Sequence, residues 1–283
     1  MGRGAGLTFD AELREAVAGA SRGVIPADRA AALEEAVGAD PLPLLVPFAR
    51  DYALPPISGF AVGAVARGGS GSLYFGANLE SVGAALSFSV HAEQAATTNA
   101  WLNGEEGLAA IAVSAAPCGY CRQFLNELAT ASTLVVIIDG HEPRLLGDLL
   151  PEAFGPLDLG VTAGLMTPQD HGLRTESRDP LVQTALAAAN ASYAPYSGGF
   201  AGVALETAGG GVYAGRYAEN TAFNPSMSPL ESALAMRALG GDVDDALTRA
   251  VLVEASSAAS QRGATAALLA VVSSVELAYF RAA

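Results

Sequence analysis

The chain has few cysteines, few basic residues and no long apolar run, and each shortage excludes a class of protein. Two cysteines in 283 residues, three positions apart, are too few for a disulfide framework; such a pair is more often metal-binding or catalytic. No apolar stretch approaches the roughly 18 residues of a membrane-spanning helix, so we expect no membrane partner. The amino terminus lacks the apolar segment of a signal peptide, which predicts a cytoplasmic protein.

Basic residues are outnumbered about two to one. The chain has 15 lysines and arginines against 29 acidic residues, and its formal net charge is −14. Binding to nucleic acid needs lysine and arginine side chains that displace counterions from phosphates. Because the sequence contains no basic run, we expect no nucleic-acid partner, and a small neutral or weakly charged ligand fits better.

Both cysteines and one of the three histidines lie between residues 91 and 121. His91, Cys118 and Cys121 supply three ligands for a tetrahedral Zn²⁺ ion and leave its fourth position open for water. Glu93 follows the histidine by two residues; it need not be a ligand, and it is well placed to move a proton. This stretch therefore predicts a catalytic zinc site.

Hydrophobic periodicity and turn residues predict an α/β architecture with helices packed on a sheet. Helices are expected at residues 9–21, 27–38, 46–52, 91–103, 118–129, 180–191 and 230–239. Strands are expected at residues 60–66, 72–78, 107–115, 134–138 and 200–204, and near Val251 and Leu277. Pro47 is expected in the first turn of its helix, where proline is tolerated. Residues 139–178 read as a poorly patterned connection, usually a functional loop or a linker.

The second half of the chain repeats the first at a spacing of about 140 residues. FAGVA at 200–204 resembles FAVGA at 60–64, for example. We expect Pro229-Leu230-Glu231 to replace the HAE of the first half, and residues 255–260 to replace PCGYC. Since the second half then has no cysteine and no histidine, it cannot carry the metal site. Its predicted role is structural, completing a core or an oligomer interface.

Each half is too large to be a solenoid repeat, so two similar domains are expected. The predicted division is a helical N-terminal extension at residues 1–42, a catalytic domain at 43–140, a connecting segment at 141–178 and a degenerate domain at 179–283.

H-x-E followed by P-C-x-x-C resembles the signature of the zinc nucleoside and nucleobase deaminases. Within that class the chain resembles, over nearly its whole length, the cytidine deaminases of the long, two-domain, homodimeric type. The motifs that carry this resemblance are FxVGA at 60–64, GANLE at 76–80, HAEQ at 91–94 and PCGYCRQFLNE at 117–127. It implies a duplicated three-layer α/β/α fold, a Zn²⁺ cofactor, a nucleoside substrate and a homodimer with active sites near the subunit interface.

The resemblance also implies residue roles. His91, Cys118 and Cys121 bind zinc. Glu93 moves protons while zinc-bound hydroxide attacks C4, so that cytidine and 2′-deoxycytidine become uridine and 2′-deoxyuridine with release of ammonia, in pyrimidine salvage. Substrate contacts are implied for Phe60, Asn78, Glu80, Ala92 and Phe154. Phe154 resembles an aromatic residue that such enzymes insert into the partner subunit's site. Ala61 departs from the pattern, because a polar residue is expected there.

Other functions fit part of the pattern. A CxxC at a helix start also occurs in thiol-disulfide oxidoreductases, although HAE would then have no role. A zinc-stabilised structural module normally has four protein ligands, and only three stand out. Deamination of a different substrate is the third alternative. Arg122 could bond a cysteine sulfur or lie in solvent, and His141 and His171 are predicted to be loop residues.

Overall fold

The computed structural model of the chain describes the backbone of residues 4–283 and the side chains from residue 11 onward. Residues 1–3 of the expected N-terminal extension therefore lie outside the described residues. The helices are α1 (Gly4–Ala18), α2 (Ala27–Val37), α3 (Pro41–Arg50), α4 (Ala92–Leu102), α5 (Gly119–Leu125), α6 (Leu146–Leu149), α7 (Pro180–Asn190), α8 (Pro229–Leu239) and α9 (Arg262–Val272), with 3₁₀ turns η1 (Leu86–Phe88), η2 (Ala131–Thr133) and η3 (Pro156–Leu159). The strands are β1 (Val24–Ile25), β2 (Gly63–Gly68), β3 (Leu73–Ala77), β4 (Leu108–Val113), β5 (Val135–Ile138), β6 (Arg144–Leu145), β7 (Ala201–Thr207), β8 (Val212–Arg216), β9 (Leu247–Ala255) and β10 (Leu277–Ala282).

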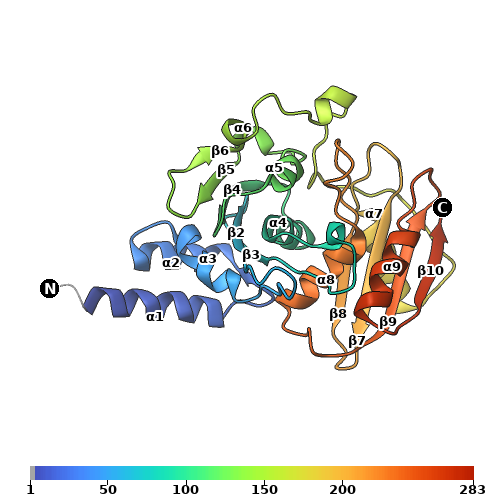
Figure 1. The fold of residues 1–283 in the computed structure, drawn as a ribbon, viewed down its shortest axis with the longest axis horizontal. Helices are drawn as coiled ribbons and strands as arrows, with labels where there is room; N and C mark the ends of the chain where they lie inside the picture. The colour runs from blue at the N-terminus through green and yellow to red at the C-terminus, as the bar shows by residue number, and fades with distance from the viewer. Residues whose placement is uncertain (1–3) are drawn as a thin grey trace.

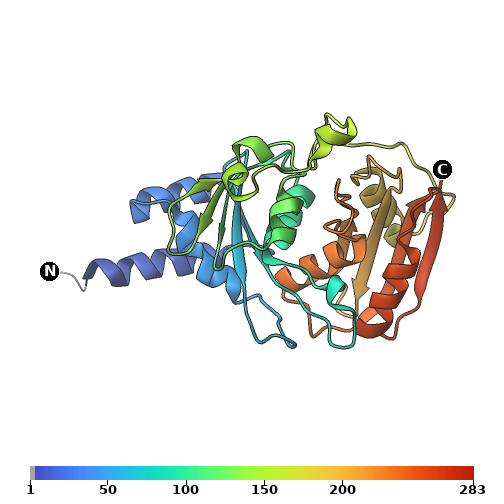
Figure 2. The same cartoon turned by 45° about the horizontal axis from the view of Figure 1, so that its top comes forward.

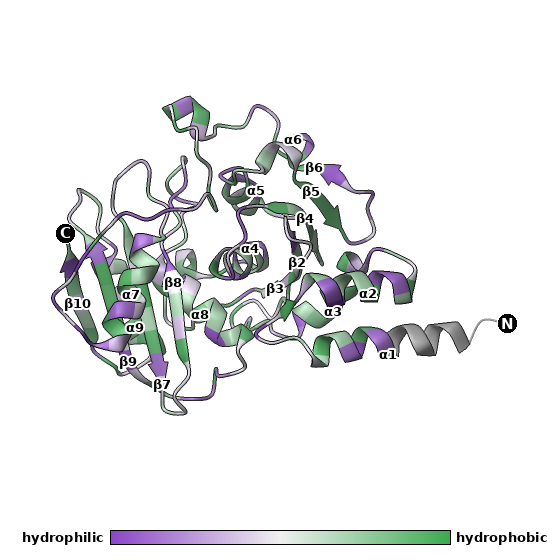
Figure 3. Cartoon of the chain, turned by 180° about the vertical axis from the view of Figure 1, so that it is seen from behind, coloured by the Kyte–Doolittle hydropathy of each residue, from purple (hydrophilic) through white to green (hydrophobic). Residues whose placement is uncertain are grey.

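The first half is built on a sheet with the strand order β1-β3-β2-β4-β5-β6. Strands β4 and β5 run parallel, and the other neighbours are antiparallel. Helix α3 packs on one side of this sheet and α4 on the other (Figure 1, Figure 2). Figure 3 shows that β5 is hydrophobic along its length, and its residues alternate between half-buried and buried.

The second half repeats this arrangement on a sheet with the order β10-β9-β7-β8. Strand β7 pairs antiparallel with β8 and β9, as β2 does with β3 and β4, and β9 runs parallel to β10 as β4 does to β5. Helices α7 and α8 cover the sheet as α3 and α4 cover the first. The predicted duplicated α/β fold is confirmed. Among the described residues, β1 and β6 have no counterparts in the second sheet.

Two glycines fix the equivalence between the halves. A Cβ atom on Gly76 would lie 2.1 Å from the backbone nitrogen of Ala96, and one on Gly215 would lie 2.4 Å from that of Ala233. Glycine therefore lets α4 and α8 approach β3 and β8 more closely than any side chain would allow. The two helices consequently occupy the same place in their respective halves.

The predicted alignment of the strand motifs is wrong by one residue. Gly63 and Gly202 occupy the same place in the two sheets, because each pairs with the residue that follows the close-packed glycine of the neighbouring strand. Counting back three residues, Gly199 rather than Phe200 is the counterpart of Phe60. The resemblance of FAGVA to FAVGA misled the alignment, because small apolar residues alternate with glycine in both.

The predicted counterpart of HAE is also wrong by one residue. His91 and Ser228 are the residues that cap the amino ends of α4 and α8. Each follows a residue bridged to the segment after the second strand of its sheet, Val90 to Leu79 and Met227 to Ala218. Ser228-Pro229-Leu230 therefore replaces HAE. Glu231, which the prediction aligned with Glu93, lies one position after the true counterpart, Leu230.

Helix α3 begins five residues before the predicted start at 46. The carboxylate of Asp40 caps it by accepting a hydrogen bond of 2.9 Å from the backbone N–H of Leu42, and Pro41 occupies the first helical position. Pro47 therefore lies inside the helix. The prediction that it lies in the first turn is wrong. Asp40 and Pro41 form the helix start signal, whereas the prediction was based on the apolar residues that follow them.

Three further segments differ from the prediction. The helix expected at 118–129 ends at Leu125, and helix α9 was not predicted at all. The connection between the halves contains β6, α6 and η3 rather than only loop. The division into four segments with the stated boundaries stays a prediction.

The two halves meet where α4 packs against α8. The hydroxyl of Thr98 donates to the sulfur of Met227 at 3.1 Å, and the Arg216 guanidinium lies 5.1 Å from the centre of the Trp101 ring while donating to its carbonyl oxygen at 3.0 Å. One hydrophobic core runs through both halves. Within residues 4–283, no helix combines the length and hydropathy that a membrane crossing requires.

Candidate functional site

The amino end of α4 carries the first part of the candidate site. His91 is the last residue before the helix, and its backbone N–H donates to the side-chain oxygen of Gln94 at 3.1 Å. This bond satisfies a backbone donor at the helix start and fixes the direction in which the chain enters. The imidazole is thus held where the chain passes from Val90, which is bridged to Leu79 after β3, into α4.

The two cysteines lie at the start of α5 and meet this histidine. The Nδ1 atom of His91 is 3.6 Å from the Cys118 sulfur and 3.3 Å from the Cys121 sulfur, and the two sulfurs are 3.6 Å apart. A tetrahedral zinc ion with ordinary bond lengths would separate its nitrogen and sulfur ligands by about 3.6 Å and two sulfurs by about 3.8 Å. The three donor atoms therefore fit Zn²⁺ in both chemistry and spacing.

The two thiols are electrostatically unequal in the protein alone. Hydrogen bonds from the Cys121 thiol and from His91 lower the pKa of Cys118 to about 3. The pKa of Cys121 is raised, first by its hydrogen bond to Cys118 and then by burial. The remaining proton therefore stays on Cys121, and a divalent cation would displace it and leave both sulfurs as thiolates.

Glu93 lies in the first turn of α4 and is only 4% exposed. Burial raises the pKa of its carboxyl group, against smaller lowering contributions from its backbone hydrogen bond and from Cys121. A carboxyl group with a raised pKa binds a proton more readily than an exposed glutamate does. The position and the chemistry suit a proton carrier beside the three donor atoms.

A pocket of about 290 Å³ opens onto these groups. Its walls are formed by Ser58, Phe60, Val62, Asn78, Glu80, Ser89, Val90, His91, Ala92, Glu93, Ala115, Ala116 and Cys118. Four of the five residues predicted to contact substrate are among them, and Phe60 stands 61% exposed in the wall. Sequence reasoning missed six wall residues, whose types are too common to indicate a site: Ser58, Val62, Ser89, Val90, Ala115 and Ala116.

Asn78 and Glu80 form hydrogen bonds within the wall of the pocket. The amide of Asn78 accepts from the N–H of Val62 at 2.8 Å and donates to the carbonyl of Phe60 at 2.9 Å. Glu80 accepts from the N–H groups of Ile57 and Ser58, both at 2.9 Å, and from the Ser58 hydroxyl at 2.6 Å.

The electrostatics of Glu80 follow from these bonds. Burial alone would raise its pKa, but the hydrogen bonds from Ser58 and Ile57 outweigh this effect and leave the pKa lowered. The carboxylate is therefore negative at neutral pH, and it presents that charge to the pocket. Together Asn78 and Glu80 fix the segment that carries Phe60, a positioning role that the sequence did not indicate.

Phe154 does not line this pocket. It lies in the connection between the halves, 48% exposed, and its carbonyl oxygen accepts from the side chains of Gln123 at 2.8 Å and Asn126 at 3.3 Å. These bonds fix the backbone of Phe154 to the end of α5 and leave its ring accessible. A contact with the site of a second subunit stays a prediction.

The residues without an assigned role also have defined places. Arg122 donates hydrogen bonds to the backbone carbonyls of Pro117 and Leu149, both at 2.8 Å. It therefore stabilises the loop before Cys118, a role different from the two that were considered. His171 stacks on Phe200, and its Nε2 lies 2.8 Å from the carbonyl oxygen of Ser192. His141 is exposed.

The corresponding region of the second half lacks the chemistry. Ser228 stands in the place of His91 and Leu230 in the place of Glu93. Glu219 still accepts from the backbone N–H groups of Tyr196 and Ser197, at 2.8 and 3.1 Å, as Glu80 does from the equivalent turn. The second half therefore has the turn but neither the histidine nor the glutamate.

Comparisons with known proteins agree with this geometry. A family model described as "Cytidine and deoxycytidylate deaminase zinc-binding region" matches residues 45–137, and a second model with the same description matches residues 146–267. The chain is 53% identical to the cytidine deaminase of Yersinia pestis (strain Pestoides F) over 218 residues, which cover 77% of this chain and 74% of that protein. It is 53% identical to the cytidine deaminase of Serratia proteamaculans (strain 568) over 227 residues, covering 80% and 77%. A crystal structure of cytidine deaminase from Mycobacterium tuberculosis aligns with a TM-score of 0.37 at 37% identity, covering 40% of this chain and 94% of that one.

We expect the three donor atoms to account for the bound zinc. The purified chain should contain about one zinc ion, and replacing His91 by Ala should reduce this to near zero, because two sulfurs alone hold the ion far more weakly. Elemental analysis by mass spectrometry after dialysis measures the content. The control is His141→Ala, the same substitution at an exposed histidine outside the site, which should keep its zinc. Full zinc content in His91→Ala would place the metal elsewhere.

Proposed function

Because this chain belongs to the cytidine and deoxycytidylate deaminase family, we propose that it hydrolyses cytidine and 2′-deoxycytidine to uridine and 2′-deoxyuridine with release of ammonia. It is a zinc-dependent hydrolytic deaminase. The observation that carries the proposed reaction is the buried Glu93 carboxyl group, which lies beside the three metal donors at a pocket of about 290 Å³. A role in pyrimidine salvage follows from the substrates.

His91, Cys118 and Cys121 would hold the zinc ion. Bound there, zinc supplies Lewis acidity that makes a water molecule acidic enough to act as a nucleophile near neutral pH. The amino ends of α4 and α5 both lie at this point, and their partial positive charge offsets the negative charge of the two thiolates.

Glu93 would move the protons of the reaction. Its carboxylate takes a proton from the attacking water and passes it to ring nitrogen N3 as the new oxygen bonds to C4. It then carries the remaining proton of that oxygen to the amino group, which leaves as ammonia while the C4 carbonyl forms. The raised pKa suits both directions of transfer.

The pocket wall would select a nucleoside. Phe60 packs against the substrate, the backbone of Ala92 contacts the base, and Asn78 and Glu80 bond the sugar hydroxyls with the hydrogen-bonding capacity left to them. The ionised Glu80 would repel a phosphate group on the sugar. Free nucleosides are therefore preferred over nucleotides.

We also propose that the enzyme is a homodimer in which Phe154 reaches the pocket of the partner subunit. The support is a group of exposed apolar side chains: Phe154 at 48%, Leu157 at 76%, Leu159 at 46% and Phe223 at 64%. The hydroxyl of Thr221 donates to the carbonyl of Gly155 at 3.4 Å, which connects the loops that carry them. Exposed apolar side chains that gather in this way mark interaction surfaces.

We place the enzyme in the cytoplasm, where both cysteines stay reduced.

Replacing Glu93 by Gln tests the proposed reaction. The variant should keep its zinc, because no metal donor changes, and should lose deamination of cytidine by about 100-fold or more, the usual contribution of a proton carrier. The loss of ultraviolet absorbance of cytidine measures the rate, and elemental analysis measures the zinc. Undiminished activity in Glu93→Gln would contradict the role of Glu93. A metal-free chain whose two thiols oxidise reversibly would favour the oxidoreductase instead.

Replacing Phe154 by Ala tests the contribution across the proposed dimer. We expect kcat/KM for cytidine to fall by about tenfold, as for one lost apolar contact in a pocket, while the zinc content is unchanged. Leu145→Ala, at an exposed leucine in β6, is the control and should keep full activity. Sedimentation equilibrium should give twice the chain mass for the unmodified protein. A monomer with full activity would refute the shared site.

A further inference from the structure

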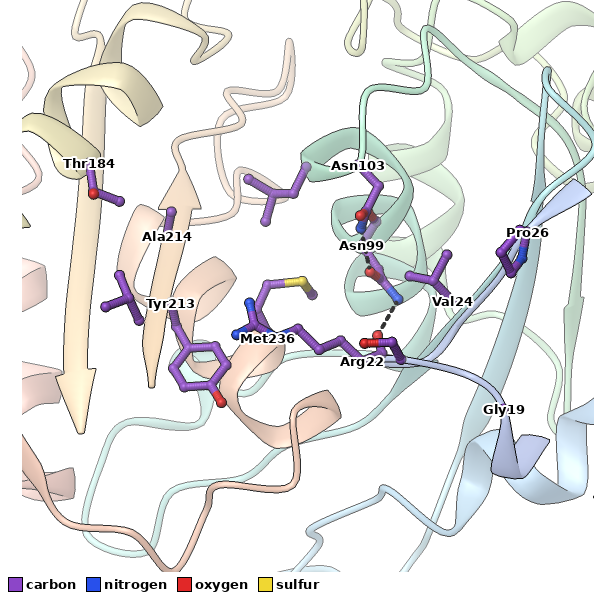
Figure 4. Close-up of a pocket in the computed structure, with 13 residues that line it drawn as sticks. Gly19, Arg22, Val24, Pro26, Asn99, Asn103, Thr184, Tyr213, Ala214 and Met236 are labelled. Atoms are coloured by element: carbon purple, nitrogen blue, oxygen red, sulfur yellow. Dashed lines mark hydrogen bonds between the residues drawn. The ribbon is translucent and has the colours of Figure 1, made fainter. Parts of the chain in front are cut away.

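A second cavity, of about 460 Å³, lies apart from the metal site (Figure 4). The segment before β1 forms one wall, the carboxyl end of α4 forms another, and β8 and α8 of the second half close it. No residue of the pocket around Glu93 contributes to it. Its volume falls within the range of sites for small organic ligands, roughly 300–1,000 Å³.

The duplicated architecture explains why this space exists. In the first half, β1 pairs with β3 and covers the edge of the sheet. In the second half, β8 is itself the edge of the described sheet, and no strand covers it. Between these unequal edges the two halves meet at α4 and α8. The segment that ends in β1 belongs to the first half alone, and it forms one wall of the cavity beside the uncovered strand β8.

A cationic side chain enters the cavity from a turn whose backbone is held in place. Arg22 has a φ of 52°, in the left-handed region that costs a non-glycine residue free energy. The buried Asn99 holds this turn, because its amide donates to the carbonyls of Arg22 and Gly23, both at 3.3 Å, and of Phe75 at 3.0 Å. Figure 4 shows the Arg22 side chain extending from this turn toward Tyr213 and Met236.

The charge of this arginine is available to a ligand. Its guanidinium lies 5.0 Å from the centre of the Tyr213 ring, and among the described residues no ion pair joins it to a carboxylate. The nearby Asp242 carboxylate instead accepts the hydroxyl of Tyr213. A guanidinium stacked on an aromatic ring keeps its N–H edge free for a phosphate.

The other walls suit an apolar body. Val24, Leu102, Val212 and Met236 are apolar, while the Tyr213 ring is only 2% exposed and lies against the Arg22 guanidinium. The side-chain amide of Asn103 donates to Asn99 at 2.8 and 3.0 Å, which turns its own carbonyl oxygen into the free acceptor of the site. A ligand that uses all of these groups has an anionic end, an apolar face and a hydrogen-bond donor.

We propose that this cavity binds a phosphate monoester with an apolar body, the class to which nucleoside monophosphates belong, and that Arg22 holds the phosphate. The inference does not depend on the proposed deaminase reaction. The two sites differ in charge, since Glu80 disfavours phosphate in one and Arg22 favours it in the other. A nucleotide can therefore bind without entering the pocket of Glu93.

Calorimetric titration of the zinc-loaded full chain with AMP tests the proposal. We expect AMP to bind the unmodified chain and to bind Arg22→Gln about tenfold or more weakly, because a charged hydrogen-bond donor to the phosphate is lost. The control is Arg144→Gln, at an exposed arginine in β6, which should bind AMP as the unmodified chain does. Equal affinity in Arg22→Gln, or no binding to the unmodified chain, would overturn the assignment.

A second variant separates binding from folding. Val212→Trp fills the cavity from the partly exposed edge strand and leaves Arg22 in place, so it should also lose AMP while keeping the zinc content. Adenosine and inorganic phosphate, each titrated alone, should both bind more weakly than AMP, since each supplies only half of the ligand. Excess cytidine should not displace AMP. Displacement by cytidine, or full affinity in Val212→Trp, would place AMP in another pocket and refute the proposal.

Discussion

The close approach of α4 to β3 is the constraint on which the rest of the structure depends. Only the absence of a side chain at Gly76 lets the helix backbone lie against the strand at this point. This packing places the amino end of α4 near the carboxyl end of β3, where His91 meets the cysteines of α5 and Glu93 is buried. A metal site needs its donors placed to within a few tenths of an ångström, and rigid backbone packing provides that precision.

The second half of the chain keeps this packing without the chemistry. Gly215 brings α8 onto β8 as Gly76 brings α4 onto β3, yet serine and leucine stand where the first half has His91 and Glu93. Neither leucine nor serine can replace a buried carboxyl group as proton carrier. What the second half contributes instead is the surface that α4 packs against, including the bond from Thr98 to Met227. We infer that it was retained because it completes the surroundings of the catalytic helix.

The sequence predicted the chemistry of the site better than its surroundings. Histidine, glutamate and two cysteines at these spacings are informative because zinc restricts the residue types that can serve it. Asn78 and Glu80 were expected to face a ligand, but much of their hydrogen bonding holds the turn that carries Phe60. That arrangement depends on backbone groups, which leave no trace in the sequence. The one-residue errors in aligning the halves have a related cause, because only strand pairing and helix caps fix a register between short motifs rich in glycine and alanine.

The central claim is that a zinc-dependent deaminase acts here on free nucleosides. A direct measurement is the comparison of cytidine, 2′-deoxycytidine and CMP as substrates of the zinc-loaded chain, followed by ultraviolet absorbance. Cytidine and 2′-deoxycytidine should be deaminated, with kcat/KM at least about tenfold above that of CMP, because the ionised Glu80 repels a phosphate on the sugar. Preferential deamination of CMP, or no deamination of any of the three, would contradict the account.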